Sequence, residues 1–524
     1  MVISGKNYNI SARCRRGAIL PKGFMKQFFS MLALSAATAT AAPLPPEHAA
    51  ALDRISASSL RGHLMFLASD LLEGRGTPSR GQDLAAAYLA AQYQRAGLEP
   101  LGDDGYFQTA HWHYSQADLS GFALTLTAGA TRLSLTPKLV TFTPGAALDA
   151  RGVALIKADW NNLAALEAMG DAVNGKVVVV EPASMQPKTA EDYAFMMGAR
   201  NATYARLARL KPLFVLALDR ARPAGNAGGR GAVSDPATRR PQGMRTITMH
   251  GTDAARLYDA LPAGATLDVR VAAASVKPIK LRNVAALLRG SDPVLKETYV
   301  VLSAHYDHLG IRADMPGDAI FNGANDNASG TVSVIEVAQA LAAMTTRPKR
   351  SIVFLNVFGE ELGMLGSTYY GRNPLVPLAK TVANLNLEQV GRTDGPEGVM
   401  KAKAALTGFD FTTMPAALVK AGKASGVEIY KDARYSDQYF AQSDNLAFAA
   451  VGVPAHTLSV LYQYAEYHGA GDHWPAIDYD NMAMINRTVA LGLLTLANDA
   501  TAPSWNGSNE KTAPYLKAQR LLIK

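Results

Sequence analysis

Three segments within residues 298–363 define the centre of the fold: TYVVLSAHYDHLG (298–310), NGANDNASG (322–330) and SIVFLNVFGEELG (351–363). The first and the third begin with short apolar runs rich in Val, Ile, Leu and Phe. Such runs are typical of parallel strands that are covered on both faces. Between them, residues 328–344 carry an apolar stripe at helical spacing. This order predicts a strand–helix–strand unit with a crossover helix.

Side chains that bind metals follow both predicted strands. His305 and Asp307 come after the first strand, Glu360 and Glu361 come after the second, and Asp326 lies in the Asn/Gly-rich loop. Ligands of parallel sheets bind beyond the carboxyl ends of the strands, so we expect these side chains to lie near one another. Taken singly, each has an ordinary structural explanation. The histidine can be hydrogen-bonded at a strand end, and a carboxylate suits the start of a helix. Their joint placement favours a metal site.

The residue types fit hydrolytic zinc chemistry. Such a site needs imidazoles and carboxylates, an open position for water, and a nearby base. Adjacent Glu360 and Glu361 suit a metal ligand beside a free base, and Asp307 is placed to accept the second N–H of the His305 ring. Glu388, after a further predicted strand, and His468, in a late loop, are additional candidates.

The composition predicts a globular protein, and the N-terminal pattern predicts that it is exported. The chain has 524 residues, which predicts two or three domains, and its hydrophobic content of 48% excludes a disordered protein. The net charge of +8 falls to +2 without residues 1–42, so it does not indicate binding to nucleic acid. Residues 1–42 combine a basic lead, an apolar run and small residues, the pattern of a secretory signal peptide. We therefore expect a periplasmic or secreted protein.

The sequence after residue 42 has no cysteine and no long apolar run. The single cysteine, Cys14, precedes the expected cleavage site, so the mature chain has no thiol for a disulfide, a nucleophile or a zinc ligand. No later apolar run reaches the length of a membrane span, which predicts no stable membrane anchor. Any metal must be held by histidines and carboxylates.

The predicted fold class is α/β, with a mixed, mainly parallel sheet flanked by helices and a mostly β inserted domain. The main domain is expected at 43–124 and 277–500, and the insert at 125–276. Residues 222–241 predict a Gly/Pro/Arg-rich loop within this insert. Residues 501–524 are predicted to form a polar, weakly patterned tail.

Six segments carry a family resemblance. They are SAHYDHLG (303–310), GANDNASG (323–330), FGEELGMLGS (358–367), NLNLEQVGR (384–392), FAQSDNLAFAAVGVPA (440–455) and YHGAGDHWPAIDY (467–479). In type and order they resemble the motifs of metallopeptidase family 28, which holds secreted bacterial aminopeptidases, glutamate carboxypeptidases and, as divergent relatives, glutaminyl cyclases. The insert resembles a protease-associated domain through NGKVVVV at 174–180.

The resemblance implies the zinc exopeptidase fold and two Zn²⁺ ions bridged by Asp326. One ion would add His305 and Glu388, and the other Glu361 and His468. It also makes Glu360 the base that takes a proton from the attacking water and passes it to the leaving amine.

Two positions depart from the family pattern. Glu388 stands where many members have aspartate, and His473 stands where a threonine is common. His468 is preferred to His473 as the ligand because it follows the tyrosine of the motif. His308 and His456 are expected to be packing or supporting residues.

The resemblance also suggests a substrate side and an activity. Ser443 and Asp444 lie in a segment resembling the border of the specificity pocket, and Tyr462 is a candidate lining residue. The expected activity is aminopeptidase action on peptides. Carboxypeptidase or dipeptidase action, glutaminyl cyclisation and a non-catalytic receptor-like role stay open, as does the oligomeric state.

Overall fold

In the computed structural model of the chain, the described residues are 44–183, 190–220, 228–229, 231–238, 245–312, 315, 317–396 and 398–523. The expected signal region at 1–42, with Cys14, lies outside them, as does part of the loop expected at 222–241. Among the helices formed by these described residues, none combines the length and the apolar character needed to cross a membrane.

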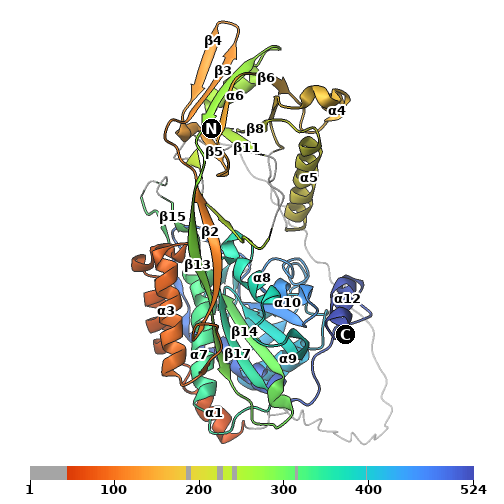
Figure 1. The fold of residues 1–524 in the computed structure, drawn as a ribbon. Coiled ribbons are helices and arrows are strands. Elements are labelled where there is room, and N and C mark those ends of the chain that lie inside the picture. Colours follow the sequence, from red (N-terminus) through yellow and green to blue (C-terminus); the bar gives the residue numbers. More distant parts are fainter. Residues whose placement is uncertain are drawn as a thin grey trace, which may run out of the picture. The chain divides into compact units, whose positions relative to one another are not determined.

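A ten-stranded mixed sheet forms the main domain (Figure 1). Its strands follow the order β10 (Ala232–Ser234), β2 (Phe107–Gln116), β13 (Ser275–Leu288), β17 (Ser351–Val357), β14 (Tyr299–His305), β18 (Thr381–Leu387), β23 (Ala455–Ser459), β21 (Lys403–Leu406) and β22 (Glu428–Tyr430), with β1 (Glu99–Pro100) paired to β13. The pairs β17–β14, β14–β18 and β18–β23 are parallel, whereas β13 and β2 are antiparallel to their neighbours. The fold is therefore mixed and parallel at its centre, as the apolar runs predict.

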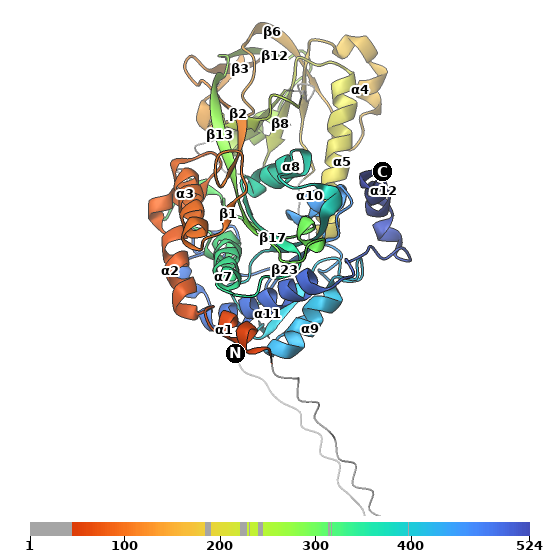
Figure 2. The same ribbon diagram turned by 60° about the horizontal axis from the view of Figure 1, so that its bottom comes forward.

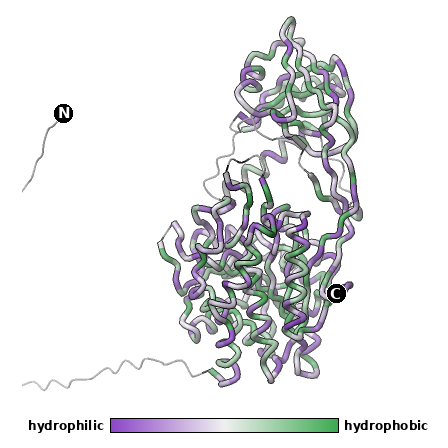
Figure 3. Tube along the Cα trace, turned by 90° about the vertical axis from the view of Figure 1, so that its left-hand side faces the viewer, coloured by the Kyte–Doolittle hydropathy of each residue, from purple (hydrophilic) through white to green (hydrophobic). Residues whose placement is uncertain are grey.

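Both faces of the central strands are covered by hydrophobic side chains. In β17, Ile352 and Phe354 enter one hydrophobic cluster, and Val353 and Leu355 enter another. Successive side chains of a strand point to opposite faces, so the two clusters lie on the two sides of the sheet. Figure 3 shows hydrophobic segments mainly inside the chain trace and hydrophilic ones mainly on its outer side. This double coverage explains why these strands are apolar at every position.

Helices cover the two faces. The helices of the main domain are α1 (Pro46–Leu52), α2 (Ala57–Leu67), α3 (Arg80–Arg95), α7 (Gly330–Ala342), α8 (Leu365–Arg372), α9 (Pro415–Ser425), α10 (Asn445–Ala450), α11 (Tyr479–Asn498) and α12 (Ala513–Leu522). Figure 2 shows α7 and α11 on one side of the sheet and α8 and α10 on the other. The predicted crossover helix is α7, which connects β14 to β17.

The insert has a sheet of its own. The order is β4 (Thr131–Leu135), β3 (Ala123–Ala128), β12 (Thr266–Val271), β6 (Leu148–Lys157), β7 (Val177–Val180), β8 (Phe214–Asp219), β11 (Thr246–His250), β5 (Val140–Phe142) and β9 (Gly228–Gly229). The helices α4 (Ala164–Ala168), α5 (Ala190–Arg209) and α6 (Thr252–Asp259) interrupt these strands. Its middle strands, from β6 to β11, are parallel.

The C-terminal residues, expected to be a polar, weakly patterned tail, contain helical structure. They form a short 3-10 turn, Glu510–Thr512, and then α12. Trp505 is buried and its ring stacks on that of Tyr515, with the ring centroids 5.0 Å apart. Few apolar residues are present here, but they pack against the main domain, so the order comes from tertiary contacts rather than from a local pattern.

Candidate metal centre

Three neighbouring parallel strands end at one edge of the large sheet. The middle strand β14 ends at His305, and the strands on either side are followed by Glu360–Glu361 and by Glu388. Gly359 precedes the glutamate pair with a φ of 68°, a left-handed conformation that suits glycine and turns the chain sharply after β17. The order of the strands thus brings four candidate side chains to one edge of the sheet: His305, Glu360, Glu361 and Glu388.

Asp326 is held in place by its loop rather than by a strand. The backbone N–H groups of Asn325 and Asp326 both donate to the carboxylate of Asp472, at 3.0 Å. The Asn327 side chain donates to the carbonyl of Leu387 at 2.9 Å, which ties the loop to the end of β18. The peptide bond between Asp326 and Asn327 is cis. Asp472 is a residue that sequence reasoning missed, because its partners lie about 150 positions away.

The first group of candidate ligands is His305, Asp326 and Glu388. Their ligand atoms all lie within 4.8 Å of one another, and His305 Nε2 is 3.5 Å from Asp326 Oδ1. The other ring nitrogen of His305 is 3.2 Å from the carbonyl oxygen of Asp307 and 3.5 Å from its carboxylate. This arrangement turns Nε2 toward the group. Asp307 also accepts the backbone N–H of Glu360 at 3.0 Å, so it links the ends of β14 and β17.

The second group gathers around Asp326 and Glu361. His468 Nε2 lies 3.1 Å from Asp326 Oδ2 and 3.4 Å from Glu361 Oε2. His308 belongs to this group as well, because its Nδ1 is 2.7 Å from Glu361 Oε1. His473 points elsewhere, toward Asp318 at 3.5 Å. The structure therefore brings His468, and not His473, to the site, and it adds His308, which was expected only to pack or support.

Burial sets the charge states of the carboxylates that lack a positive partner. It raises the pKa of Glu360 well above its ordinary value, although the nearby His305 acts in the opposite direction. Burial also raises the pKa of Glu388 to about 7. For Glu361, burial alone would raise the pKa, but His308 and His468 outweigh it and lower the pKa. These protein groups by themselves hold an excess of negative charge.

Several buried polar atoms of the site have no partner in hydrogen-bonding geometry. Among the described residues these include His305 Nε2, both ring nitrogens of His308, and Glu361 Oε1. An unpaired buried polar atom costs free energy unless something else satisfies it. A cation between these atoms would satisfy them and offset the carboxylates. The imidazole and carboxylate donors are those that Zn²⁺ takes in catalytic sites, so the residues fit zinc.

Arg75 supports the site from outside it. Its guanidinium is buried and donates to four carbonyl oxygens, those of Leu67, Tyr306, Asn322 and Gly323. Tyr306 follows His305, and residues 322–323 begin the loop of Asp326, so one side chain connects both ligand segments. The sequence around Arg75, DLLEGRGT (70–77), contains no pattern that identifies this role.

A polar cavity lies beside Glu388. Its lining is Glu388, Gln389, Thr407, Tyr439, Gln442, Ser443, Thr457, Ser459, Tyr462, Gln463 and Tyr467. Two of the candidate substrate residues, Ser443 and Tyr462, are in this lining. The third, Asp444, is buried and accepts a hydrogen bond from Ser367. Burial raises its pKa to about 6.

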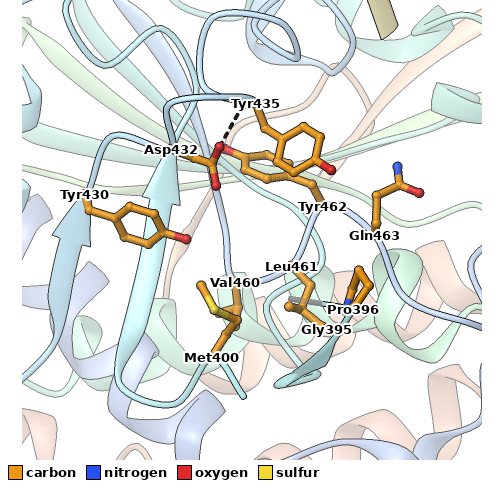
Figure 4. A pocket seen from close by; sticks show the side chains of 10 residues that line it. All are labelled: Gly395, Pro396, Met400, Tyr430, Asp432, Tyr435, Val460, Leu461, Tyr462 and Gln463. Atoms are coloured by element: carbon orange, nitrogen blue, oxygen red, sulfur yellow. Dashed lines mark hydrogen bonds between the residues drawn. The ribbon is translucent and has the colours of Figure 1, made fainter. Parts of the chain in front are cut away.

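A second pocket adjoins the cavity, and the two share Tyr462 and Gln463. Figure 4 shows Tyr430, Tyr435 and Tyr462 around it, with Met400 nearby. The ring of Tyr462 also stacks on Tyr439 with centroids 5.1 Å apart. The cavity beside Glu388 thus continues into an aromatic wall.

Comparison with known sequences points to one family. Residues 283–492 match the model of Peptidase family M28. A protein of Leptosphaeria maculans named "Probable zinc metalloprotease" is 29% identical over 209 residues, which cover 38% of this chain and 44% of that protein. One of the same name from Pyricularia oryzae is 31% identical over 211 residues, covering 38% and 39%. The chain thus spans about two fifths of the length of these curated relatives.

Comparison with solved structures extends over more of the chain. The aminopeptidase from Aneurinibacillus sp. strain AM-1 aligns with a TM-score of 0.58 and 17% identity, covering 87% of this chain and 97% of that one. The zinc aminopeptidase BSAP from Bacillus subtilis aligns with a TM-score of 0.53 and 14% identity, covering 84% and 95%. These alignments show a shared fold.

Proposed function

Since residues 283–492 belong to peptidase family M28, we propose that this protein is an exported, zinc-dependent aminopeptidase that acts on peptides. Two Zn²⁺ ions are its cofactors in this proposal. His305, Asp326 and Glu388 hold one, and Asp326, Glu361 and His468 hold the other. In this proposal the main domain occupies residues 43–124 and 277–500 together with the C-terminal segment that ends in α12, and residues 125–276 form a protease-associated-like insert.

One observation carries the proposal. Two groups of ligand atoms share Asp326, one completed by His305 and Glu388 and the other by His308 and Glu361. The partly exposed His468 lies beside the second group, 3.1 Å from Asp326 Oδ2. Glu360 stands next to Glu361 and belongs to neither group. Such a pair of positions, 3.5–4 Å apart in enzymes that use two metals, polarises the substrate carbonyl and acidifies a water. Glu360 is then the base beside the reacting atoms.

The chain's own residues have separate tasks in this reaction. Glu360 takes the proton of the attacking water and delivers it to the leaving amine. Asp307 fixes the ring of His305 and also holds the backbone N–H of Glu360, so the ligand and the base are positioned together. Ser443 and Tyr462 border the space for the substrate side chain, and the buried Asp444 follows Ser443 and anchors this segment to Ser367.

The lining of the cavity favours aminopeptidase over carboxypeptidase action. None of the described residues that line the cavity beside Glu388 is a lysine or an arginine. A carboxypeptidase has to bind a free carboxylate, for which arginine is the usual partner. Uncharged polar groups next to an acidic centre suit a substrate whose free end is an ammonium group.

Glutaminyl cyclisation and a receptor-like role fit the site less well. Cyclisation at a single zinc leaves the second ligand group without a task. A receptor-like protein that has lost its metal is expected to lack ligands, whereas His and carboxylate donors occupy every position of both groups. Binding of one tight zinc per chain, with no activation by a second equivalent, would favour the cyclase.

Replacement of Glu360 by glutamine tests the proposed base. The amide cannot accept the proton, so we expect kcat/KM to fall by about 10²–10⁴-fold while both zinc ions stay bound. Hydrolysis of aminoacyl substrates and zinc content are measured on the same preparation. The control is Glu297→Gln, a change at an exposed glutamate. Full activity of Glu360→Gln, or of the wild type after chelation, contradicts the proposal.

A substrate panel separates the exopeptidase types. The zinc-loaded wild type is assayed with free-amino peptides, N-blocked peptides and C-terminal dipeptide substrates. We expect cleavage of the free-amino peptides alone. Cleavage restricted to N-blocked substrates refutes the aminopeptidase assignment and leaves the metal site intact.

Export rests on residues 1–42, where basic residues precede an apolar run and small residues. N-terminal sequencing of the protein from periplasmic and culture fractions tests it. We expect a start near residue 43, and retention of the uncleaved chain in the cytoplasm refutes export.

A further inference from the structure

His308 has no assigned task, although its surroundings are unusual for a packing residue. It follows β14 by three positions and its side chain is fully buried. Neither ring nitrogen has a partner in hydrogen-bonding geometry among the described residues, although Nδ1 lies close to Glu361. Burial of this imidazole is costly, because both nitrogens lose water and only Nδ1 gains a contact, the one with the Glu361 carboxylate.

The ring of His308 is fixed in direction. A Cβ on Gly323 would lie 2.4 Å from its Cγ, so the backbone of the Asp326 loop lies directly against the imidazole. Its own backbone N–H donates to the carbonyl of Arg75 at 3.3 Å. The contact with Gly323 leaves little room for another ring position, and Nδ1 is therefore held toward Glu361.

The distances around Asp326 and Glu361 resemble those around a metal ion. In a tetrahedral zinc site, with bonds of 2.0–2.2 Å, neighbouring ligand atoms are roughly 3.3–3.6 Å apart. His308 Nδ1 is 2.7 Å from Glu361 Oε1 and 3.9 Å from Asp326 Oδ2. His468 Nε2 is 3.1 Å from Asp326 Oδ2 and 3.4 Å from Glu361 Oε2. These four distances bracket the tetrahedral value, with His308 facing Oε1 and His468 facing Oε2 of the Glu361 carboxylate.

We propose that His308 Nδ1 is a fourth protein ligand of the zinc ion held by Asp326, Glu361 and His468. The inference rests on the proposed metal centre. It makes the two positions unequal, since the position of His305, Asp326 and Glu388 has three protein ligands and stays open. Closed four-ligand sites are typical of tightly held zinc, and open three-ligand sites are typical of catalytic zinc. The Glu361 side then retains its ion, and the Glu388 side exchanges its ion more readily.

A crystal structure of the zinc-loaded wild type, with anomalous data at the zinc edge, tests the ligand directly. We expect two peaks, one of them about 2.0–2.2 Å from His308 Nδ1. A peak on the Glu361 side that lies more than about 3 Å from Nδ1, with His308 hydrogen-bonded to Glu361, overturns the inference and leaves the proposed function standing. A chain that binds no zinc overturns both.

Zinc titration of the metal-free protein provides a second measurement. The variant is His308→Phe, which keeps a planar ring, and the control is His473→Phe, which changes a histidine outside both groups. For the wild type and the control we expect one tight and one weaker zinc equivalent. In His308→Phe the tight equivalent should weaken by at least about tenfold. Unchanged tight binding in a folded His308→Phe protein contradicts the inference.

Discussion

At the level of single residues, Arg75 shows how a buried cation can organise an acidic site. Its four hydrogen bonds join the segment after β14 to the loop of Asp326. Burial lowers the pKa of Arg75 to about 10, against the attraction of Asp307 and Asp472. The guanidinium is thus still charged at neutral pH and offsets part of the carboxylate excess.

Replacement of Arg75 by lysine is expected to weaken both the fold and the metal site. One ammonium group has three donors and no planar fork, so at least one buried carbonyl loses its partner. We expect the free energy of unfolding of the metal-free protein to fall by about 1–3 kcal/mol. Zinc affinity should fall as well, because the two ligand segments are less firmly connected. Arg80→Lys, at an exposed arginine, is the control. Unchanged unfolding and unchanged zinc affinity would show that Arg75 does not organise the site.

His456 predicts a pH dependence of stability that is separate from the metal ligands. Burial lowers its pKa from 6.5 to about 4. The unfolded chain therefore binds a proton below about pH 6.5 that the folded chain binds only below about pH 4. The contribution of His456 to the free energy of unfolding therefore falls as the pH drops through this window, by an amount on the order of 3 kcal/mol.

The measurement is chemical unfolding of the metal-free protein at several pH values from 4 to 7. His456→Gln keeps a polar group near Thr407 and Thr412, and it should remove the contribution of His456 alone. The contributions of Glu388 and Asp444, whose raised pKa values act in the opposite direction, should remain, so the wild type should lose more stability than the variant as the pH falls. His111→Gln, at an exposed histidine, should keep the slope. An equal slope in His456→Gln and the wild type contradicts the assignment.

At the level of elements, the C-terminal segment supports the region that borders the cavity. Trp505 donates its ring N–H to the carbonyl of Gly452 at 2.9 Å. A Cβ on Gly452 would lie 2.3 Å from the backbone nitrogen of Gln519, so α12 packs directly on the turn before β23. Phe440, three residues before Ser443, packs against Tyr515 with ring centroids 5.4 Å apart. The segment is therefore part of the main domain's packing.

Truncation of Trp505 measures this contribution. Trp505→Ala removes a buried aromatic side chain and should lower the free energy of unfolding by about 3–5 kcal/mol. Leu521→Ala on α12, where the side chain is 65% exposed, is the control and should change stability by less than about 0.5 kcal/mol. Equal small effects of the two changes would mean that the segment is not docked in solution.

At the level of the whole molecule, the insert and the main domain have separate hydrophobic cores. The clusters of the insert draw on residues between 117 and 271, and the main clusters draw on the remainder apart from a contact by Val233. The strands that lead into and out of the insert, β2 and β13, pair with each other, and Gln116 lies directly opposite Ser275. The insert is thus attached at the end of an antiparallel hairpin.

This register predicts that the insert can be removed. Residues 117–274 are replaced by Asn-Gly, the preferred two-residue hairpin turn. We expect the shortened chain to unfold in one cooperative transition and to bind as much zinc as the full chain. Loss of β10 leaves an edge of β2 uncovered, so some aggregation is expected. A soluble but unfolded product contradicts the independence of the two cores.

Local sequence patterns were sufficient to predict the central sheet and its likeness to a zinc peptidase. The apolar runs at 298–304 and 351–358 and the stripe at 328–344 predict the sheet, and the six motifs between residues 303 and 479 carry the family resemblance. The comparisons agree with both the fold and the family. The candidate ligands, from His305 to His468, were also predicted as a set. Each follows a predicted strand or lies in one of the six motifs, so the local sequence was enough to select them as candidates.

The other residues around these ligands could be identified only from the folded chain. Asp472 caps a loop about 150 positions earlier, and Arg75 reaches carbonyls more than 230 positions later. His308 had the right residue type, but the sequence could not show which way its ring points. The periodicity of a sequence indicates only how residues are placed within one helix or strand and its near neighbours along the chain. Hydrogen bonds between distant segments depend instead on how the sheet and its loops pack in three dimensions.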